Sequence, residues 1–157
     1  MHTFTSALAL IGVSVPGHLE ADAEVPILCT PQAQGDLLVF PVELSRKVRW
    51  QELPPTGVQV IRGEATGNTH WLHSGFDSPG VRWAPMSEDD RKEWPADEAA
   101  LLIGHLDVPA DQSALLIHTD EHGANGIGPG RYAIHRKRQS IPGVAPFHGN
   151  DWRFHAD

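Results

Sequence analysis

The sequence predicts a mainly β fold: a single-domain antiparallel sandwich, jelly roll or small barrel with at most one short helix near 87–94. Two observations indicate this class. Short apolar runs of strand length recur along the chain, separated by turns rich in Gly and Pro, which is typical of antiparallel β proteins. The capping pattern of a helix is clear in one segment only. A length of 157 residues suits one domain with its own core.

Four extended segments are predicted in the first half of the chain, at 7–15, 25–29, 37–42 and 58–64. Apart from histidine, no basic residue precedes the first of them, so we interpret it as a first strand or arm and not as a signal peptide. Pro41 has no N–H for a sheet ladder, so its strand ends near Phe40 or lies at an edge. We therefore divide the chain into an N-terminal arm or first strand, 1–24, and a β domain, 25–157.

The second half of the chain begins with a predicted short strand at 80–84 and the one predicted helix. Ser87 can cap this helix, acidic residues occupy its first turn, and Pro95 ends it. Three strands are predicted after it, at 99–108, 113–118 and 131–139. Trp152 and Phe154 are two residues apart and would share one face of an extended tail.

Composition and charge restrict the classes of partner. The formal net charge is −8 with histidine neutral, which disfavours nonspecific binding to nucleic acid or anionic lipid. The apolar N-terminal run is too short to span a bilayer, which needs about 20 residues. Cys29 is the one cysteine, and its apolar surroundings predict a buried, unreactive thiol. We expect a cytoplasmic or particle-associated protein in a reducing compartment, with secretion less favoured.

The densest set of potential metal ligands lies between two predicted strands. His118, Glu121 and His122 belong to one loop, and His70 would join them if its strand pairs with the strand that ends at His118. Imidazole nitrogens and carboxylate oxygens suit zinc, iron, manganese or nickel. We therefore predict a divalent metal site made of His70, His118, Glu121 and His122. The alternative is a polar loop with surface histidines and a His70 that serves packing.

Two histidines near the middle of the chain should not act together. His70 and His73 are three residues apart, a spacing that puts them on opposite faces of a strand. His70 would instead share a site with one histidine of the 118–122 loop and with a carboxylate, either Glu64 or Glu121.

The one concentrated basic segment runs from 131 to 138. Arg131, Arg136 and Arg138 are the candidate binding residues for an acidic partner. The alternative is a solvated edge strand whose charges deter pairing between sheet edges. Aromatic residues are not interleaved with the basic ones, so base stacking is not indicated.

Other chemistries lack their sequence patterns. There is no Gly-x-Ser-x-Gly elbow around a serine nucleophile. The glycines from 123 to 130 lack the Lys-Ser/Thr ending and the helix of a phosphate-binding loop.

Four short motifs resemble a known set of proteins. They are Gln34-Gly35-Asp36, then Gly63-Glu64-Ala65-Thr66-Gly67-Asn68-Thr69-His70, then Glu121-His122, then Pro129-Gly130-Arg131-Tyr132. Over about residues 32–139 the chain resembles small β-rich proteins of bacteria and their phages that have Gln-Gly-Asp, Gly-Glu-x-Thr-Gly-His-x-His, Glu-His and Pro-Gly-x-Tyr in this order. The resemblance implies that these motifs belong together in this order, and it implies no activity. This chain has Asn68 where that pattern has its first histidine, so a metal site encoded by the pattern would lack one ligand here.

These observations lead to two hypotheses about function. The first is a non-enzymatic binding or assembly protein, homo-oligomeric or part of a phage particle, with a His/Glu metal site and an apolar N-terminal arm that contacts a neighbouring subunit. The alternative is a cupin-like, divalent-metal-dependent enzyme in which Glu64 or Glu121 is a ligand or base. An enzyme needs the metal-binding side chains around a pocket with an open coordination position.

Overall fold

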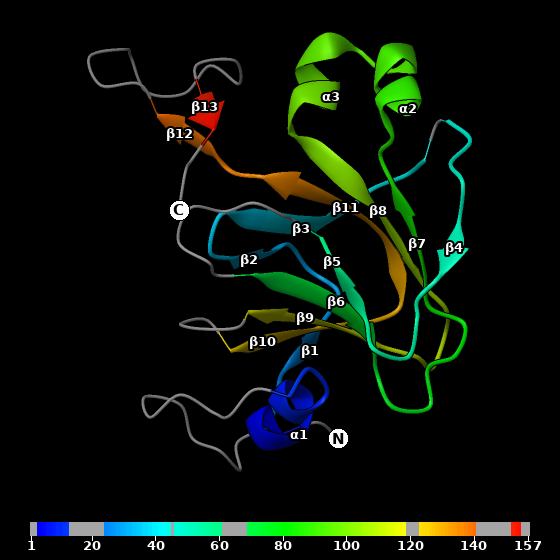
Figure 1. Ribbon diagram of the computed structural model, residues 1–157, viewed down its shortest axis with the longest axis vertical. Helices are drawn as coiled ribbons and strands as arrows, with labels where there is room; N and C mark the ends of the chain where they lie inside the picture. The colour runs from blue at the N-terminus through cyan, green and yellow to red at the C-terminus, as the bar shows by residue number, and fades with distance from the viewer. Residues whose placement is uncertain are drawn as a thin grey trace.

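The computed structural model describes residues 3–12, 24–44, 46–60, 69–118, 123–140 and 152–154. Two β-sheets that pack face to face as a sandwich form the body of the described structure (Figure 1). The predicted mainly β, antiparallel class is confirmed, and a sandwich is the architecture observed. One pair among the described strands, β1 with β10, runs parallel.

Each of the two sheets combines strands from both halves of the chain. The five-stranded sheet has the order β1-β10-β9-β6-β5, with β1 Ile27–Leu28, β10 Ala124–Ile127, β9 Ala114–His118, β6 His70–Ser74 and β5 Val58–Gln59. The six-stranded sheet has the order β2-β3-β11-β8-β7-β4, with β2 Gln32–Gln34, β3 Leu37–Pro41, β11 Gly130–Arg136, β8 Leu102–Val108, β7 Arg82–Pro85 and β4 Gln51–Glu52. In addition, β12 Arg138–Ser140 pairs with β13 Trp152–Phe154.

The main core lies between the two sheets. Leu72 and Leu116 of the five-stranded sheet face Leu37, Leu106 and Ile134 of the six-stranded sheet, and none of the five is more than 1% exposed. Because side chains alternate between the faces of a strand, every second residue of these strands enters this core. The remaining residues form the two outer faces.

The described part of the N-terminal segment is helical and does not form the first strand that was one of our two interpretations. Helix α1 spans Phe4–Ala9, and the Thr3 hydroxyl caps it by accepting a hydrogen bond from the backbone N–H of Ser6 at 3.1 Å. Leu8 is fully buried and packs with Leu115 and Ile117 on the outer face of the five-stranded sheet. Ala and Leu are strong helix formers, and a short apolar run does not by itself distinguish a strand from a helix.

Two short helices lie side by side at one end of the six-stranded sheet (Figure 1). Helix α2, Glu88–Glu93, confirms the predicted helix, and the Ser87 cap accepts from the Asp90 N–H at 3.1 Å. Helix α3, Ala96–Leu101, was not predicted and occupies the beginning of the strand expected at 99–108. Its sequence is rich in Ala, Glu and Leu, which favour helix, so β8 begins only at Leu102.

Candidate functional site

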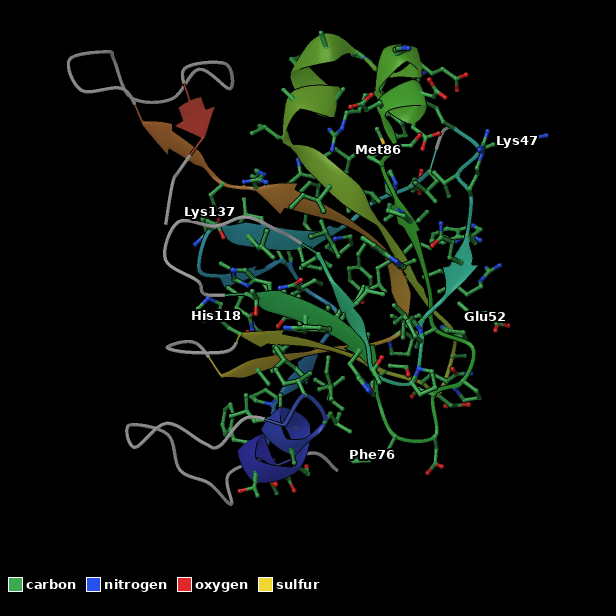
Figure 2. All side chains as sticks on the ribbon, viewed as in Figure 1. Lys47, Glu52, Phe76, Met86, His118 and Lys137 are labelled. Atoms are coloured by element: carbon green, nitrogen blue, oxygen red, sulfur yellow. The ribbon has the colours of Figure 1, made fainter. Side chains whose placement is uncertain are left out.

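Two of the predicted metal ligands, His70 and His118, lie side by side. They are paired in register where β6 and β9 run antiparallel, and their ring centroids are 4.3 Å apart. His70 is 0% exposed and His118 is 2% exposed; Figure 2 labels His118 at this end of the sandwich. His73 follows on the opposite face of β6, as its spacing predicted, where its Nε2 lies 2.7 Å from the Pro55 carbonyl oxygen.

The other sheet supplies a carboxylate and an amide to His70. Nδ1 of His70 lies 3.0 Å from Oε1 of Gln34, at the end of β2. Nε2 of His70 lies 3.2 Å from Oδ1 of Asp36, in the turn that leads into β3. Gln34 and Asp36 are each 2% exposed. These contacts therefore connect the two sheets through buried polar atoms.

A chain of amides fixes the orientation of Gln34. Gln32 donates to the Gly126 carbonyl at 2.9 Å, Asn125 donates to Oε1 of Gln32 at 3.2 Å, and Gln34 donates to Oδ1 of Asn125 at 2.9 Å. Gln34 also donates to the Leu116 carbonyl at 2.8 Å. Since backbone carbonyls only accept hydrogen bonds, the NH₂ of Gln34 must face Leu116. Its oxygen must therefore face His70.

This orientation determines the hydrogen bonds of His70. Its Nδ1 carries a proton and donates to Gln34, because the oxygen of Gln34 can only accept. Nε2 of His70 lies 3.2 Å from Oδ1 of Asp36, an ion-pair distance between an imidazole and a carboxylate. Both ring nitrogens thus lie against protein groups.

The predicted four-ligand metal site stays a prediction. Glu121 and His122 lie outside the described residues, and so does Glu64. Within the described parts of the chain, no group of three or more His, Cys, Asp or Glu side chains is placed to hold a metal ion. Of the predicted set, the structure brings together His70 and His118.

Sequence reasoning gave no role to Gln34 and Asp36, although both belong to the first of the four motifs. Their position in the sequence could have indicated a role, because two polar residues flank a glycine just before a fully apolar strand. Gly35 adopts a positive φ of 57°, so the chain turns there and directs both side chains toward the opposite sheet. The packing of the two sheets determines which polar residues of the opposite sheet these side chains contact.

The last of the four motifs has a structural role in the described chain. The Tyr132 hydroxyl donates to the Gly128 carbonyl at 2.8 Å, and burial raises the pKa of this phenol, with a smaller contribution from a hydrogen bond to the Cys29 thiol. Cys29 itself is exposed, so the prediction of a buried thiol is wrong. The short strand β1 ends just before it, at the edge of the sheet, so the residue is exposed although its thiol contacts the Tyr132 hydroxyl.

The three predicted binding arginines do not form one patch. Arg131, at the start of β11, pairs with Asp107 at 3.3 Å and lies over the Trp50 ring. Arg136, at the end of β11, is separated from it by five residues, roughly 17 Å along a strand. The side chain of Arg138 is outside the described part of the structure.

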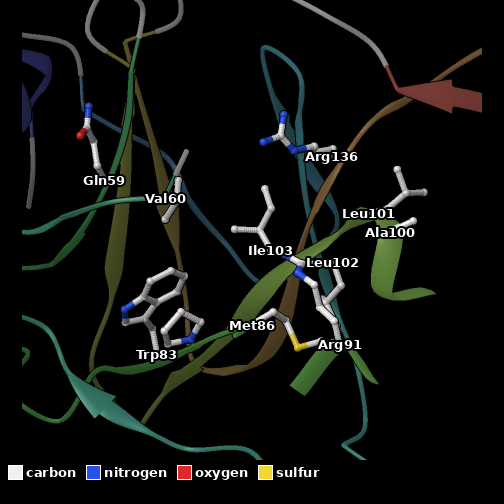
Figure 3. A pocket seen from close by; sticks show the side chains of 11 residues that line it. Gln59, Val60, Trp83, Met86, Arg91, Ala100, Leu101, Leu102, Ile103 and Arg136 are labelled. Carbon is white, nitrogen blue, oxygen red and sulfur yellow. The ribbon is translucent and has the colours of Figure 1, made fainter. Parts of the chain in front are cut away.

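Arg136 instead lines a hollow together with Arg91 of α2. This arginine hollow has a volume of about 300 Å³ and is lined by Gln59, Val60, Trp83, Pro85, Met86, Arg91, Ala100, Leu101, Leu102, Ile103 and Arg136. Figure 3 shows the two arginines on either side of the apolar side chains of Leu102 and Ile103. Val60 and Trp83 belong to the main core, so the hollow opens at the core-facing side of the six-stranded sheet.

The burial of His105 leads us to expect that the stability of the fold depends on pH. His105 is 3% exposed on the outer face of β8, and burial lowers its pKa from 6.5. Below pH 6.5 the unfolded chain binds more protons at this site than the folded chain does, so stability falls as the pH decreases through this range. We expect the free energy of unfolding of the wild type to fall more steeply than that of His105→Gln between pH 7.5 and 5.5, by at most about 1.4 kcal/mol per pH unit.

Urea unfolding at several pH values measures this difference. The other histidines contribute to both proteins, so subtracting the two curves isolates His105. Parallel curves would contradict a neutral, buried His105.

Comparison with known proteins gives one match. A family model described as Domain of unknown function (DUF8820) matches residues 33–137. Neither the curated proteins nor the solved structures contain a significant match to the chain. A search of the described helices finds none with the length and apolar character needed to cross a membrane.

Proposed function

Because the chain belongs to this family of unknown function, whose model includes every residue of the arginine hollow, we propose that it is a non-enzymatic binding protein and that this hollow holds a small organic anion. The observation that carries the proposal is the presence of two guanidinium groups, from α2 and β11, around one hollow. Arginine is the preferred partner for carboxylate and phosphate oxygens, which its planar group can contact through two N–H donors.

The walls of the hollow indicate the rest of the ligand. Val60, Trp83 and Ile103 supply apolar surface beside the arginines, and Gln59 supplies an amide. Arg91 is anchored by a hydrogen bond that it donates to the Ala99 carbonyl, which orients its guanidinium. The lining has several polar groups and only a limited apolar surface, so a small ligand with one anionic group and a short apolar part would match it.

The contacts of His70, the histidine of the second motif, support a binding function over a catalytic one. His70 donates to Gln34 and lies at ion-pair distance from Asp36, so it serves as a buried connection between the two sheets. A general acid or base must instead reach a substrate.

Titration with an aliphatic anion tests the proposal. We expect hexanoate to bind with a Kd on the order of 1 mM, typical of a ligand of this size, and hexanol to bind at least tenfold more weakly. Arg91→Gln or Arg136→Gln should each weaken hexanoate binding by about 10- to 100-fold, the value of one hydrogen bond to a charged group. Isothermal titration calorimetry measures these constants.

Arg131→Gln is the matched control, because Arg131 lies on the same strand as Arg136 but pairs with Asp107. It should bind hexanoate as the wild type does. If hexanoate binds equally well to the Arg136→Gln and Arg131→Gln proteins, the arginine hollow is not the site.

A second candidate, assembly as a homo-oligomer or within a phage particle, is favoured by the edge strand β1. Ile27 is 46% exposed and Leu28 is 44% exposed, at the edge of the five-stranded sheet. Apolar residues exposed at a sheet edge suit pairing with a second copy of the chain. Light scattering on the purified protein tests this candidate, because a monomer at high micromolar concentration would exclude a stable homo-oligomer.

The remaining alternative is a metal-dependent, cupin-like enzyme. It now depends on His118 together with Glu121 and His122, because His70 is engaged with Gln34 and Asp36. Zinc, iron, manganese or nickel would suit such ligands. Elemental analysis of the untagged protein tests it, and about one equivalent of metal would favour it over simple binding.

A further inference from the structure

A second hollow lies on the outer face of the six-stranded sheet. This aromatic hollow has a volume of about 340 Å³ and is lined by Phe40, Val42, Glu43, Leu44, Trp94, Leu102, His105, Ala133 and His135. Its volume is in the range of small-molecule sites. It shares Leu102 with the arginine hollow, but its aromatic residues and His105 do not line that hollow.

The register of three strands builds the floor of this hollow. Phe40 of β3 is paired with Ala133 of β11, which is paired in turn with His105 of β8. The three side chains therefore form a row across the sheet, with the smallest in the middle. The methyl group of Ala133 leaves the space between the rings of Phe40 and His105 unfilled.

Aromatic rings form the walls and part of the cover. The ring centroids of Phe40 and His135 are 4.9 Å apart. Trp94, at the end of α2, lies over His105 with a centroid distance of 5.3 Å and an interplanar angle of 30°. The faces of these rings favour stacking or edge-to-face contact with another aromatic group.

One buried polar atom in this hollow has no partner within the described chain. Nδ1 of His105 makes no hydrogen bond, although the residue is 3% exposed. Buried polar atoms are normally hydrogen-bonded, and an exception indicates a missing group. His105 lines the hollow beneath the Trp94 ring, so a molecule that inserts beside this ring would reach Nδ1 and supply that hydrogen bond.

We infer that the aromatic hollow binds a flat aromatic molecule with one N–H or O–H group, which donates to Nδ1 of His105. The ring of the ligand lies over Ala133 and contacts Phe40 and Trp94, and the hydrogen bond to His105 fixes its orientation. This site is independent of the proposed anion site, since the groups that define the two differ.

Indole and phenol are the probes for this site, and toluene is the probe without a hydrogen-bond donor. We expect saturable binding of indole and phenol with Kd values on the order of 0.1–1 mM, as for other ligands of this size, and binding of toluene at least fivefold weaker. Saturation-transfer NMR and calorimetry on the full chain measure both. Absence of saturable indole and phenol binding up to 10 mM, roughly tenfold above that range, would overturn the proposal.

Two variants test the location. Ala133→Leu fills the floor and should weaken indole binding at least tenfold, and Trp94→Leu, which removes a half-buried ring outside the sheets, should weaken it about fivefold. Arg131→Gln, which changes a residue that pairs with Asp107 and lines neither hollow, should leave indole binding unchanged. Thermal melts identify variants that fail to fold. If Ala133→Leu does not fold, Trp94→Leu alone tests the location of the site. Unchanged indole binding by a folded Ala133→Leu or Trp94→Leu protein would overturn the assignment.

A third variant tests the hydrogen bond. His105→Leu keeps an apolar wall but removes Nδ1, so it should bind indole and toluene with similar affinity. If the preference for indole over toluene persists in His105→Leu, His105 is not the acceptor.

Discussion

Replacing His70 with leucine is expected to lower the free energy of unfolding by about 3–5 kcal/mol, the cost of removing one partner from a buried polar pair. Leucine has a similar volume, so the loss does not come mainly from a cavity. It comes from Asp36 and the oxygen of Gln34, which lose the imidazole donor while they remain 2% exposed. Urea unfolding followed by tryptophan fluorescence measures the change.

His73→Leu is the matched control, because it makes the same change on the same strand. His73 is 7% exposed and its ring nitrogens contact the backbone carbonyls of Pro55 and Ser74 and no charged group, so its loss should cost only about 1–2 kcal/mol. Equal losses for the two variants would show that the network around His70 has no special role.

A double variant separates the pair from its surroundings. His70→Leu with Asp36→Leu replaces both partners by apolar groups, a change that is often close to neutral for a buried ion pair. The double variant should therefore lose less stability than the sum of the two single variants, by more than about 1 kcal/mol. Additive losses would mean that His70 and Asp36 act independently.

The sequence was sufficient to predict the elements that depend on local pattern. The apolar runs at 37–42 and 113–118 became β3 and β9, because alternate residues of each enter the core. Ser87 became a helix cap, because the capping interaction is confined to Ser87 and Asp90. These features need no information about the rest of the chain.

Features that depend on which segments meet could not be predicted in the same way. The contacts of His70 with Gln34 and Asp36 cross from one sheet to the other, between residues more than thirty positions apart. Arg136 joins Arg91 at the arginine hollow only because α3 replaces the beginning of the strand expected at 99–108 and lies beside α2. In each case the residue types indicate which interactions are possible, and the packing of sheets and helices determines which residues interact.

Helix α1 leads to the second large expected effect. Leu8→Ala should lower the free energy of unfolding by about 2–5 kcal/mol, the usual cost of truncating a fully buried leucine. Leu8 is 0% exposed and packs with Leu115 and Ile117, each also 0% exposed. An arm held out for a neighbouring subunit would not bury a leucine in this way, so α1 is expected to belong to the folded core of its own chain.

Leu10→Ala is the control, because it makes the same change at the end of the same helix on a residue that is only partly buried. It should cost less than about 1.5 kcal/mol, in proportion to the smaller apolar area that it buries. Half-buried Trp71 packs in the same cluster, so its fluorescence should report the loosening of α1 before global unfolding. If Leu8→Ala lowers the free energy of unfolding no more than Leu10→Ala does, α1 is a dispensable arm. The exposed edge at Ile27 and Leu28 then becomes a stronger candidate for an assembly surface. If Leu8→Ala costs the full amount, residues before the family match at 33 are needed to cover the outer face of β9, and the folding unit of this chain is larger than the matched domain.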